Sequence, residues 1–127
     1  MTSETTSAAK TILICEDDEN LRELMRIAVG PQYRCVEASD GQEVVDLVHE
    51  LDPDLVLLDL MLPGKTGFDI LAELHAQRAA DRPPVVVVTA WSHDRDAVLD
   101  AGADRFVAKP FVPDDLRTIV EELLEAP

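Results

Sequence analysis

The chain has 127 residues, of which 26 are acidic and 11 are basic, and its formal net charge is −15. This length suits one domain with a core of its own, and no apolar run approaches the roughly 20 residues that a membrane span needs. The negative field repels phosphate backbones, so we expect this domain not to bind nucleic acid directly. The start, MTSETTSAAK, lacks the apolar centre of a signal peptide, which favours the cytoplasm.

The Ser/Thr-rich start of the chain has the composition of a disordered segment. Residues 1–9 are therefore predicted to be a disordered tail, and residues 10–127 to form the folded domain. Cys15 and Cys35 do not have the spacing of metal ligands. Both fall in predicted strands, which indicates reduced thiols in the core.

Strands and helices alternate in the first half of the chain. A strand at Thr11–Cys15 runs into the acidic residues 16–19, and an amphipathic helix follows. A half-exposed strand covers Tyr33–Glu37. The next helix opens where Ser39 and Gln42 have the spacing of a capping box.

The central strand is Leu55–Leu58, which runs straight into Asp59. Four consecutive apolar residues are typical of a strand that has helices on both faces. Burying an unpaired carboxylate is unfavourable, so Asp59 is expected at the edge of the sheet, facing water or a cation. A third helix begins near Thr66. The face that it is predicted to bury consists of Phe68, Leu71, Ala72 and His75.

The second half of the chain continues the alternation. The most apolar strand, Val85–Val88, ends at Thr89. Weak periodicity over residues 92–101 predicts the least firmly packed helix. A more polar strand at residues 104–108 runs into Lys109-Pro110, and a last amphipathic helix follows.

Five strands alternating with five helices predict an α/β fold, a doubly wound parallel sheet with helices on both faces. The first, third and fourth strands are apolar throughout and should lie inside, whereas the two mixed strands should form the edges. Right-handed crossovers and short connections then favour the strand order 2-1-3-4-5, the known flavodoxin-like (βα)5 arrangement. Sites in such sheets form at the carboxyl ends of the strands where the order reverses, here between the first and third strands.

The residues at those strand ends indicate the chemistry of the site. They are Glu16 and Asp17 after the first strand, Asp59 after the third, Thr89 at the end of the fourth and Lys109 after the fifth. Three converging carboxylates repel one another unless a cation neutralises them. Mg²⁺, a hard cation held by oxygen ligands, is the predicted cofactor. The loop after the first strand is acidic and lacks the glycines of a nucleotide-binding loop.

Four segments, in this order, resemble the receiver domain of bacterial two-component response regulators such as the chemotaxis regulators. They are ILICEDDENLREL, LVLLDLMLPGKTG, VVVVTA and AGADRFVAKPF, and the resemblance covers almost the whole chain. It implies a cytoplasmic signalling domain that takes a phosphoryl group from a sensor histidine kinase or a phosphotransfer protein. Such a domain is a phospho-acceptor that assists its own phosphorylation and dephosphorylation, rather than an enzyme.

The resemblance also implies a role for each site residue. Asp59 matches the carboxylate that accepts the phosphoryl group. Asp17, Asp59 and the backbone carbonyl of Met61 match the direct Mg²⁺ ligands, and Glu16 matches a residue that acts through water. Lys109 matches the residue that pairs with Asp59 and then with the phosphoryl oxygens.

Two further residues match the switch of the family. Thr89 matches the hydroxyl that swings to the phosphoryl group, and Phe106 the aromatic ring that turns inward behind it. The implied output surface, formed by the helix at residues 92–101, the strand at 104–108 and the last helix, would contact a downstream protein or effector domain. The family resemblance also implies a cis Lys109–Pro110 bond.

The chain departs from its relatives at several positions. Phe106 stands where many relatives have tyrosine. Met61 and Trp91 are large and poorly suited to orient water, so slow self-dephosphorylation is predicted. Arg95 and Asp115 match one charged pair of the dimers that DNA-binding relatives form, but the other positions do not fit. We therefore expect a monomer or a weak dimer that does not associate with membranes.

Three alternative functions compete with this interpretation. A haloacid-dehalogenase-like phosphatase also uses an Asp nucleophile, but it requires a second Asp where Met61 stands. The acidic first loop disfavours a flavodoxin-like cofactor binder. A degenerate receiver that acts only by binding is disfavoured because every expected site residue is present.

Overall fold

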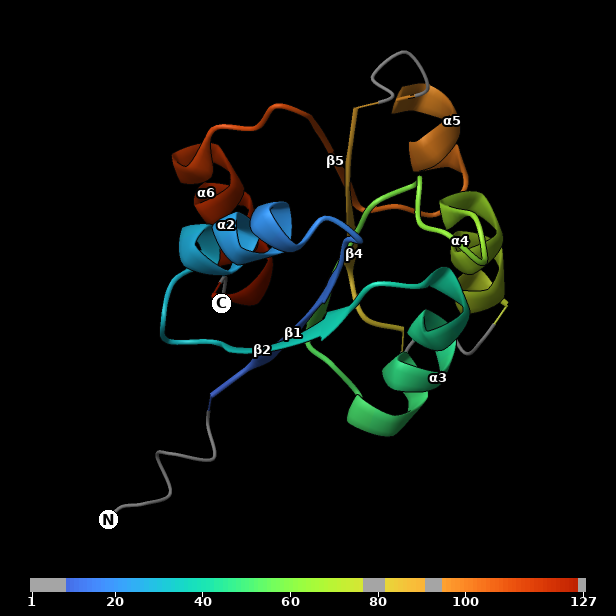
Figure 1. The fold of residues 1–127 in the computed structure, drawn as a ribbon, viewed down its shortest axis with the longest axis horizontal. Coiled ribbons are helices and arrows are strands. Elements are labelled where there is room, and N and C mark those ends of the chain that lie inside the picture. The colour runs from blue at the N-terminus through green and yellow to red at the C-terminus, as the bar shows by residue number, and fades with distance from the viewer. Residues whose placement is uncertain (1–8, 77–81, 91–94, 126–127) are drawn as a thin grey trace.

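The computed structural model describes residues 9–76, 82–90 and 95–125, and within these residues five parallel strands form one sheet. The strands are β1 (Thr11–Cys15), β2 (Arg34–Ala38), β3 (Leu55–Leu58), β4 (Val85–Thr89) and β5 (Arg105–Ala108). The helices are α2 (Glu19–Val29), α3 (Gly41–Leu51), α4 (Gly67–His75), α5 (Arg95–Asp100) and α6 (Pro113–Leu124). The strand order, β2-β1-β3-β4-β5, confirms the predicted flavodoxin-like arrangement (Figure 1).

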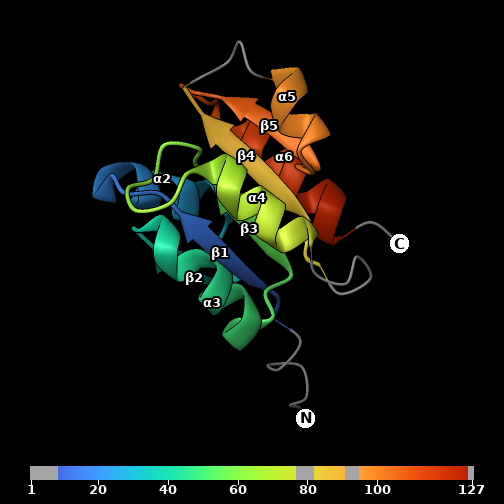
Figure 2. The same ribbon diagram turned by 90° about the vertical axis from the view of Figure 1, so that its right-hand side faces the viewer.

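The sheet lies between two layers of helices. Helices α2 and α6 cover one face, and α3, α4 and α5 cover the other (Figures 1 and 2). Alternate side chains of β1 point to opposite faces of the sheet. Leu13 packs on the side of α3 and α4, whereas Ile12 and Ile14 pack on the side of α2 and α6. Every residue of β3 and β4 is buried. The continuous apolar runs of these strands follow from coverage on both faces.

Side-chain caps fix where three helices begin. Asp18 caps α2 by accepting a hydrogen bond from the amide of Leu21, and Thr66 caps α4 in the same way. The predicted capping box at Ser39 is wrong. Asp40 caps α3 instead, because its carboxylate accepts a hydrogen bond from the amide of Gln42 at 2.7 Å.

The predicted buried face of α4 is also wrong by part of a turn. Phe68 is 37% exposed, and His75 is exposed as well. The residues that α4 buries are Gly67, Ile70, Leu71 and Leu74. This set has the same i, i+3, i+4, i+7 spacing, and it presents more aliphatic surface to the core.

The first residue of α3 packs tightly against the loop that follows Asp59. The amide of Gly41 donates a hydrogen bond to the carbonyl of Pro63 at 2.8 Å. A Cβ atom at Gly41 would lie 2.2 Å from the carbonyl oxygen of Lys65. Only glycine therefore allows the loop to approach this closely.

Replacing Gly41 by alanine should lower the free energy of unfolding by about 2 kcal/mol, because the Lys65 backbone has to move to make room for the methyl group. Urea unfolding measures this loss. Gln42→Ala is the matched control, because Gln42 is exposed and an exposed change at this helix end is expected within about 0.5 kcal/mol of the wild type. Equal stabilities of the two variants would contradict the tight packing.

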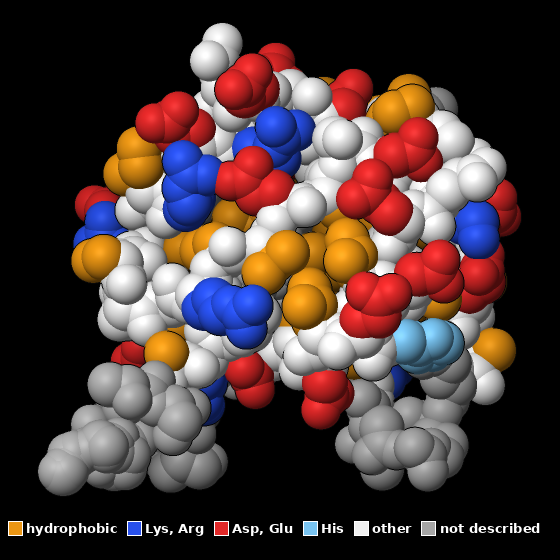
Figure 3. Space-filling model, turned by 60° about the horizontal axis from the view of Figure 1, so that its bottom comes forward, with side chains coloured by type: hydrophobic (Ala, Val, Ile, Leu, Met, Phe, Trp, Pro, Cys, Tyr) orange, Lys and Arg blue, Asp and Glu red, His pale blue; other side chains and the backbone are white. Residues whose placement is uncertain are grey.

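Several further expectations concern the surface and the cysteines. Acidic side chains are spread over the face in Figure 3, with basic and hydrophobic side chains among them. Among the described residues, none of the helices combines the length and apolarity required to cross a bilayer.

Cys15 is buried in β1 and Cys35 is half-buried in β2, and both are free thiols as predicted. Trp91 and almost all of the predicted tail lie outside the described residues.

Candidate functional site

The backbone brings the predicted site residues to one edge of the sheet. Glu16 directly follows β1, Asp59 follows β3 and Lys109 follows β5. The backbone amide of each residue continues the hydrogen bonding of the sheet one step beyond its strand. Glu16 N donates to Ala38 O, Asp59 N to Cys15 O and Lys109 N to Thr89 O, at 2.8–3.0 Å. The sheet itself therefore determines where these three side chains start.

The ammonium group of Lys109 binds two carboxylates at once. Its Nζ atom donates to Glu16 Oε1 at 2.7 Å and to Asp59 Oδ2 at 3.0 Å. Glu16 is 1% exposed and Asp59 is 4% exposed, so both carboxylates need such partners. Their other oxygens accept backbone amides at 3.1 Å, Asp18 N for Glu16 and Met61 N for Asp59.

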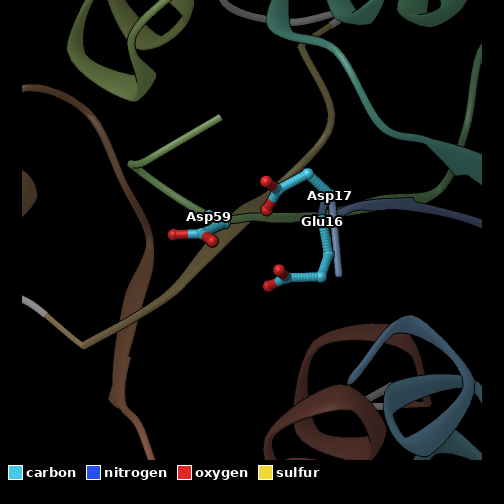
Figure 4. Close-up of side chains that lie close together, drawn as sticks. All are labelled: Glu16, Asp17 and Asp59. Carbon is cyan, nitrogen blue, oxygen red and sulfur yellow. The ribbon is translucent and has the colours of Figure 1, made fainter. Parts of the chain in front are cut away.

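Three carboxylates meet in one space at this edge. Glu16, Asp17 and Asp59 each offer an oxygen atom, and these atoms lie within 4.8 Å of one another. Figure 4 shows Glu16 and Asp17 reaching this space from the end of β1 and Asp59 from the end of β3. With Lys109 as the ammonium, three negative charges and one positive charge leave a net charge of −2.

The donor set fits a hard divalent cation such as Mg²⁺. All three donors are carboxylate oxygens, and the net charge of the group favours a cation. Asp17 is exposed while Glu16 and Asp59 are buried, so one side of the group opens to solvent. That opening suits Mg²⁺, which keeps several of its waters when it binds to proteins.

The environment shifts the titration of Glu16 and Lys109. Burial raises the pKa of Glu16, and the negative charge of Asp59 adds to this, against the opposing hydrogen bonds from Lys109 and the Asp18 amide. Burial acts to lower the pKa of Lys109, but its hydrogen bonds to Glu16 and Asp59 and their charges outweigh burial and raise it. Lys109 therefore remains an ammonium throughout the physiological pH range.

The two predicted switch residues lie on neighbouring strands. Thr89 is fully buried at the carboxyl end of β4, which pairs with β3 on one side and β5 on the other. Phe106 lies opposite Val87 on β5, and its partly buried ring packs against the core on the side of α3, α4 and α5. The predicted cis peptide bond at Lys109–Pro110 is present.

Comparison with known proteins identifies the family. A family profile described as "Response regulator receiver domain" matches residues 12–121. The chain belongs to this family. It is 42% identical over 108 residues to the DNA-binding response regulator MtrA of Mycolicibacterium smegmatis, a match that covers 83% of this chain and 46% of that protein. The receiver domain therefore spans about half the length of this relative.

Solved structures agree with the assignment. A putative response regulator from Chloroflexus aurantiacus superposes with a TM-score of 0.84 at 28% identity, over 92% of this chain and 98% of that one. The BeF3-activated DrrB receiver domain gives a TM-score of 0.82 at 26% identity, over 92% of this chain and 98% of its own. This chain is thus the receiver domain of a response regulator of a two-component system.

One well-placed residue of this receiver domain was not identified from the sequence. Arg22, in the first turn of α2, donates from Nη1 to the carbonyl oxygen of Glu16 at 2.8 Å and from Nε to Glu37 Oε1 at 2.9 Å. An arginine in an amphipathic helix is typical of a solvated face, and nothing in its spacing predicts these acceptors. The contacts depend on how α2 lies across β1 and β2.

Proposed function

We propose that this receiver domain accepts a phosphoryl group on Asp59 from the phosphohistidine of a sensor histidine kinase or a phosphotransfer protein. The observation that carries the proposal is the position of Lys109 Nζ, 3.0 Å from Asp59 Oδ2 beside a carboxylate group suited to Mg²⁺. In the reaction a carboxylate oxygen of Asp59 forms a bond to phosphorus as the bond from phosphorus to the imidazole nitrogen breaks.

The residues of the site have different roles in this transfer. Asp17, Asp59 and the Met61 carbonyl would hold Mg²⁺ directly, and Glu16 would hold it through water. When bound, Mg²⁺ neutralises charge on the phosphoryl oxygens and orients them. Lys109 already lies against Asp59 and can transfer its hydrogen bond to a phosphoryl oxygen without leaving the site.

The output of the domain is proposed to pass through α5, β5 and α6. The acyl phosphate adds negative charge and acceptor oxygens, to which the Thr89 hydroxyl can donate. Movement of Thr89 toward Asp59 would draw in the end of β4 and make room for the Phe106 ring. A downstream protein or an effector domain in the cytoplasm would then bind the altered surface.

We also propose a long-lived acyl phosphate and a weak tendency to dimerise for this receiver domain. Met61, two residues after Asp59, is 57% exposed, and its side chain offers no group that could activate water, which favours a long-lived acyl phosphate over phosphatase activity. Arg105 binds Glu122 within the same chain at 2.8 Å on the output surface. This contact satisfies two charged groups of that surface within the chain, which favours a monomer or weak dimer. We propose that the folded domain covers residues 10–127 and follows a tail at residues 1–9.

Beryllium fluoride, a mimic of a phosphoryl group, tests this proposal by NMR. With MgCl2 and beryllium fluoride, we expect the amide signals of Thr89, Phe106 and the α5, β5 and α6 segments to shift in the wild type. MgCl2 alone should shift only the loops around Glu16 and Asp59. The Asp59→Asn variant should show no response to beryllium fluoride. Shifts confined to those loops would refute the proposed output surface, and no shifts at all would refute the phosphoryl site.

A further inference from the structure

Arg22 connects the acidic loop after β1 to the edge strand β2. Its side chain is only 16% exposed, although it belongs to a surface helix. One guanidinium group spans two acceptors, the backbone carbonyl of Glu16 and the carboxylate of Glu37 on β2. Arg26, one turn further along α2, donates to the other oxygen of the same Glu37 carboxylate.

The bond to the Glu16 carbonyl acts on the neighbouring residue. The carbonyl of Glu16 and the amide of Asp17 belong to one planar peptide unit, so holding that oxygen fixes the plane from which Asp17 departs. The amide of Glu16 is already held by Ala38 O at 3.0 Å, and the amide of Asp18 by Glu16 Oε2 at 3.1 Å. The Glu16–Asp17 peptide lies between these two amides, and Arg22 is the residue that holds it, through its carbonyl oxygen.

We infer that Arg22 is a positioning residue for the divalent cation, because it sets the direction of the Asp17 carboxylate through the Glu16–Asp17 peptide. The inference rests on the proposed function, since it takes Asp17 as a cation ligand. Glu37 holds the guanidinium in place and balances its charge. Outer contacts that orient a ligand commonly change metal affinity by about 10-fold or more when they are removed.

A purely electrostatic role for Arg22 predicts the opposite result. Removing a positive charge close to a cation site strengthens cation binding by Coulomb's law. Loss of a positioning contact weakens it, because Asp17 then samples directions in which its carboxylate does not reach the ion. The sign of the change in Mg²⁺ affinity therefore separates the two explanations.

The test is titration of the unphosphorylated protein with MgCl2 by isothermal titration calorimetry, at constant ionic strength. For Arg22→Met we expect the Kd for Mg²⁺ to rise about 10-fold. For Arg22→Lys, which keeps the charge but cannot span both acceptors, we expect a rise of about 3-fold.

Arg26→Met is the matched control, because it removes the other guanidinium group that binds the Glu37 carboxylate. Its Kd for Mg²⁺ should stay the same or fall slightly.

Each outcome has a definite meaning. An unchanged or lower Kd for Arg22→Met would overturn the inference, and if that variant does not fold, an unchanged Kd for Arg22→Lys would do so. Failure of the wild type to bind Mg²⁺ would instead refute the proposed cation site. As a second readout, phosphorylation of Arg22→Lys by acetyl phosphate should require more Mg²⁺ for its half-maximal rate, with a nearly unchanged rate at saturating Mg²⁺. A lower rate at saturating Mg²⁺ with no change in the Mg²⁺ requirement would contradict a positioning role.

Discussion

Replacing Lys109 by methionine should destabilise the metal-free protein by about 3 kcal/mol at pH 7, because it leaves two buried carboxylates without their cation. Glu16 and Asp59 would then face each other at the end of the sheet with only backbone amides as partners. The same change should slow phosphorylation by acetyl phosphate about 100-fold, the usual effect of removing one donor to a developing oxyanion. Urea unfolding in EDTA and the rate of labelling in saturating Mg²⁺ measure the two effects separately.

The stability of Lys109→Met should depend on pH in a definite direction. The pKa of Glu16 is already raised, and loss of the Lys109 hydrogen bond, which lowers it, raises it further. A carboxyl group with a raised pKa in the folded state contributes stability at low pH and loses it as the pH rises through that pKa. The deficit of the variant should therefore shrink as the pH is lowered from neutrality toward the ordinary pKa of a glutamate side chain. A constant deficit over this range would contradict the assignment of Lys109 as the counter-ion of these carboxylates.

The Asp59→Asn variant should be more stable than the wild type in EDTA, by about 1–2 kcal/mol. Asp59 faces two like charges, Glu16 and Asp17, within 4.8 Å, and one opposite charge, Lys109. At an effective dielectric constant near 20, two unit charges interact by about 3.5 kcal/mol at 4.8 Å and by about 5.5 kcal/mol at the 3.0 Å that separates Asp59 from Lys109. The two repulsions therefore exceed the one attraction by about 1–2 kcal/mol.

Added Mg²⁺ should reverse the order of stability of Asp59→Asn and the wild type. The wild type gains stability as it binds the ion, whereas the variant has lost one ligand and gains less. Thermal unfolding in EDTA and across a series of Mg²⁺ concentrations follows this crossover. A variant that is less stable than the wild type in EDTA would show that the pair with Lys109 dominates over the repulsion. Asp69→Asn, a change of the same kind at an exposed residue of α4, controls for the loss of one charge.

Patterns that depend only on strand burial could be predicted from the sequence. The unbroken apolar runs of β3 and β4 indicated coverage on both faces, and from this the strand order followed. Because parallel strands end at one edge, the order was enough to bring together the carboxylates of Glu16 and Asp59 and the ammonium of Lys109.

Details that depend on how elements pack against one another could not be predicted. Two stripes on α4 have the same spacing, and only contact with Leu60 and the rest of the core favours the one that contains Gly67. Ser39 and Asp40 are both good capping residues, and the entry angle of the chain places Asp40 over the helix end. Arg22 reaches both the Glu16 carbonyl and the Glu37 carboxylate because of how α2 packs beside β1 and β2, which no local pattern encodes.

Intact-protein mass after incubation with acetyl phosphate tests the central claim most directly. The wild type and Asp59→Asn would each be measured with MgCl2 and with EDTA. We expect a single phosphoryl adduct on the wild type in MgCl2, and none in the other three samples. An adduct of equal yield on Asp59→Asn would contradict the assignment of Asp59, and an equal yield in EDTA would contradict the role of the carboxylate group as a Mg²⁺ site. A wild type that binds Mg²⁺ but gains no adduct from acetyl phosphate or from a phosphorylated histidine kinase would contradict the phospho-acceptor function itself.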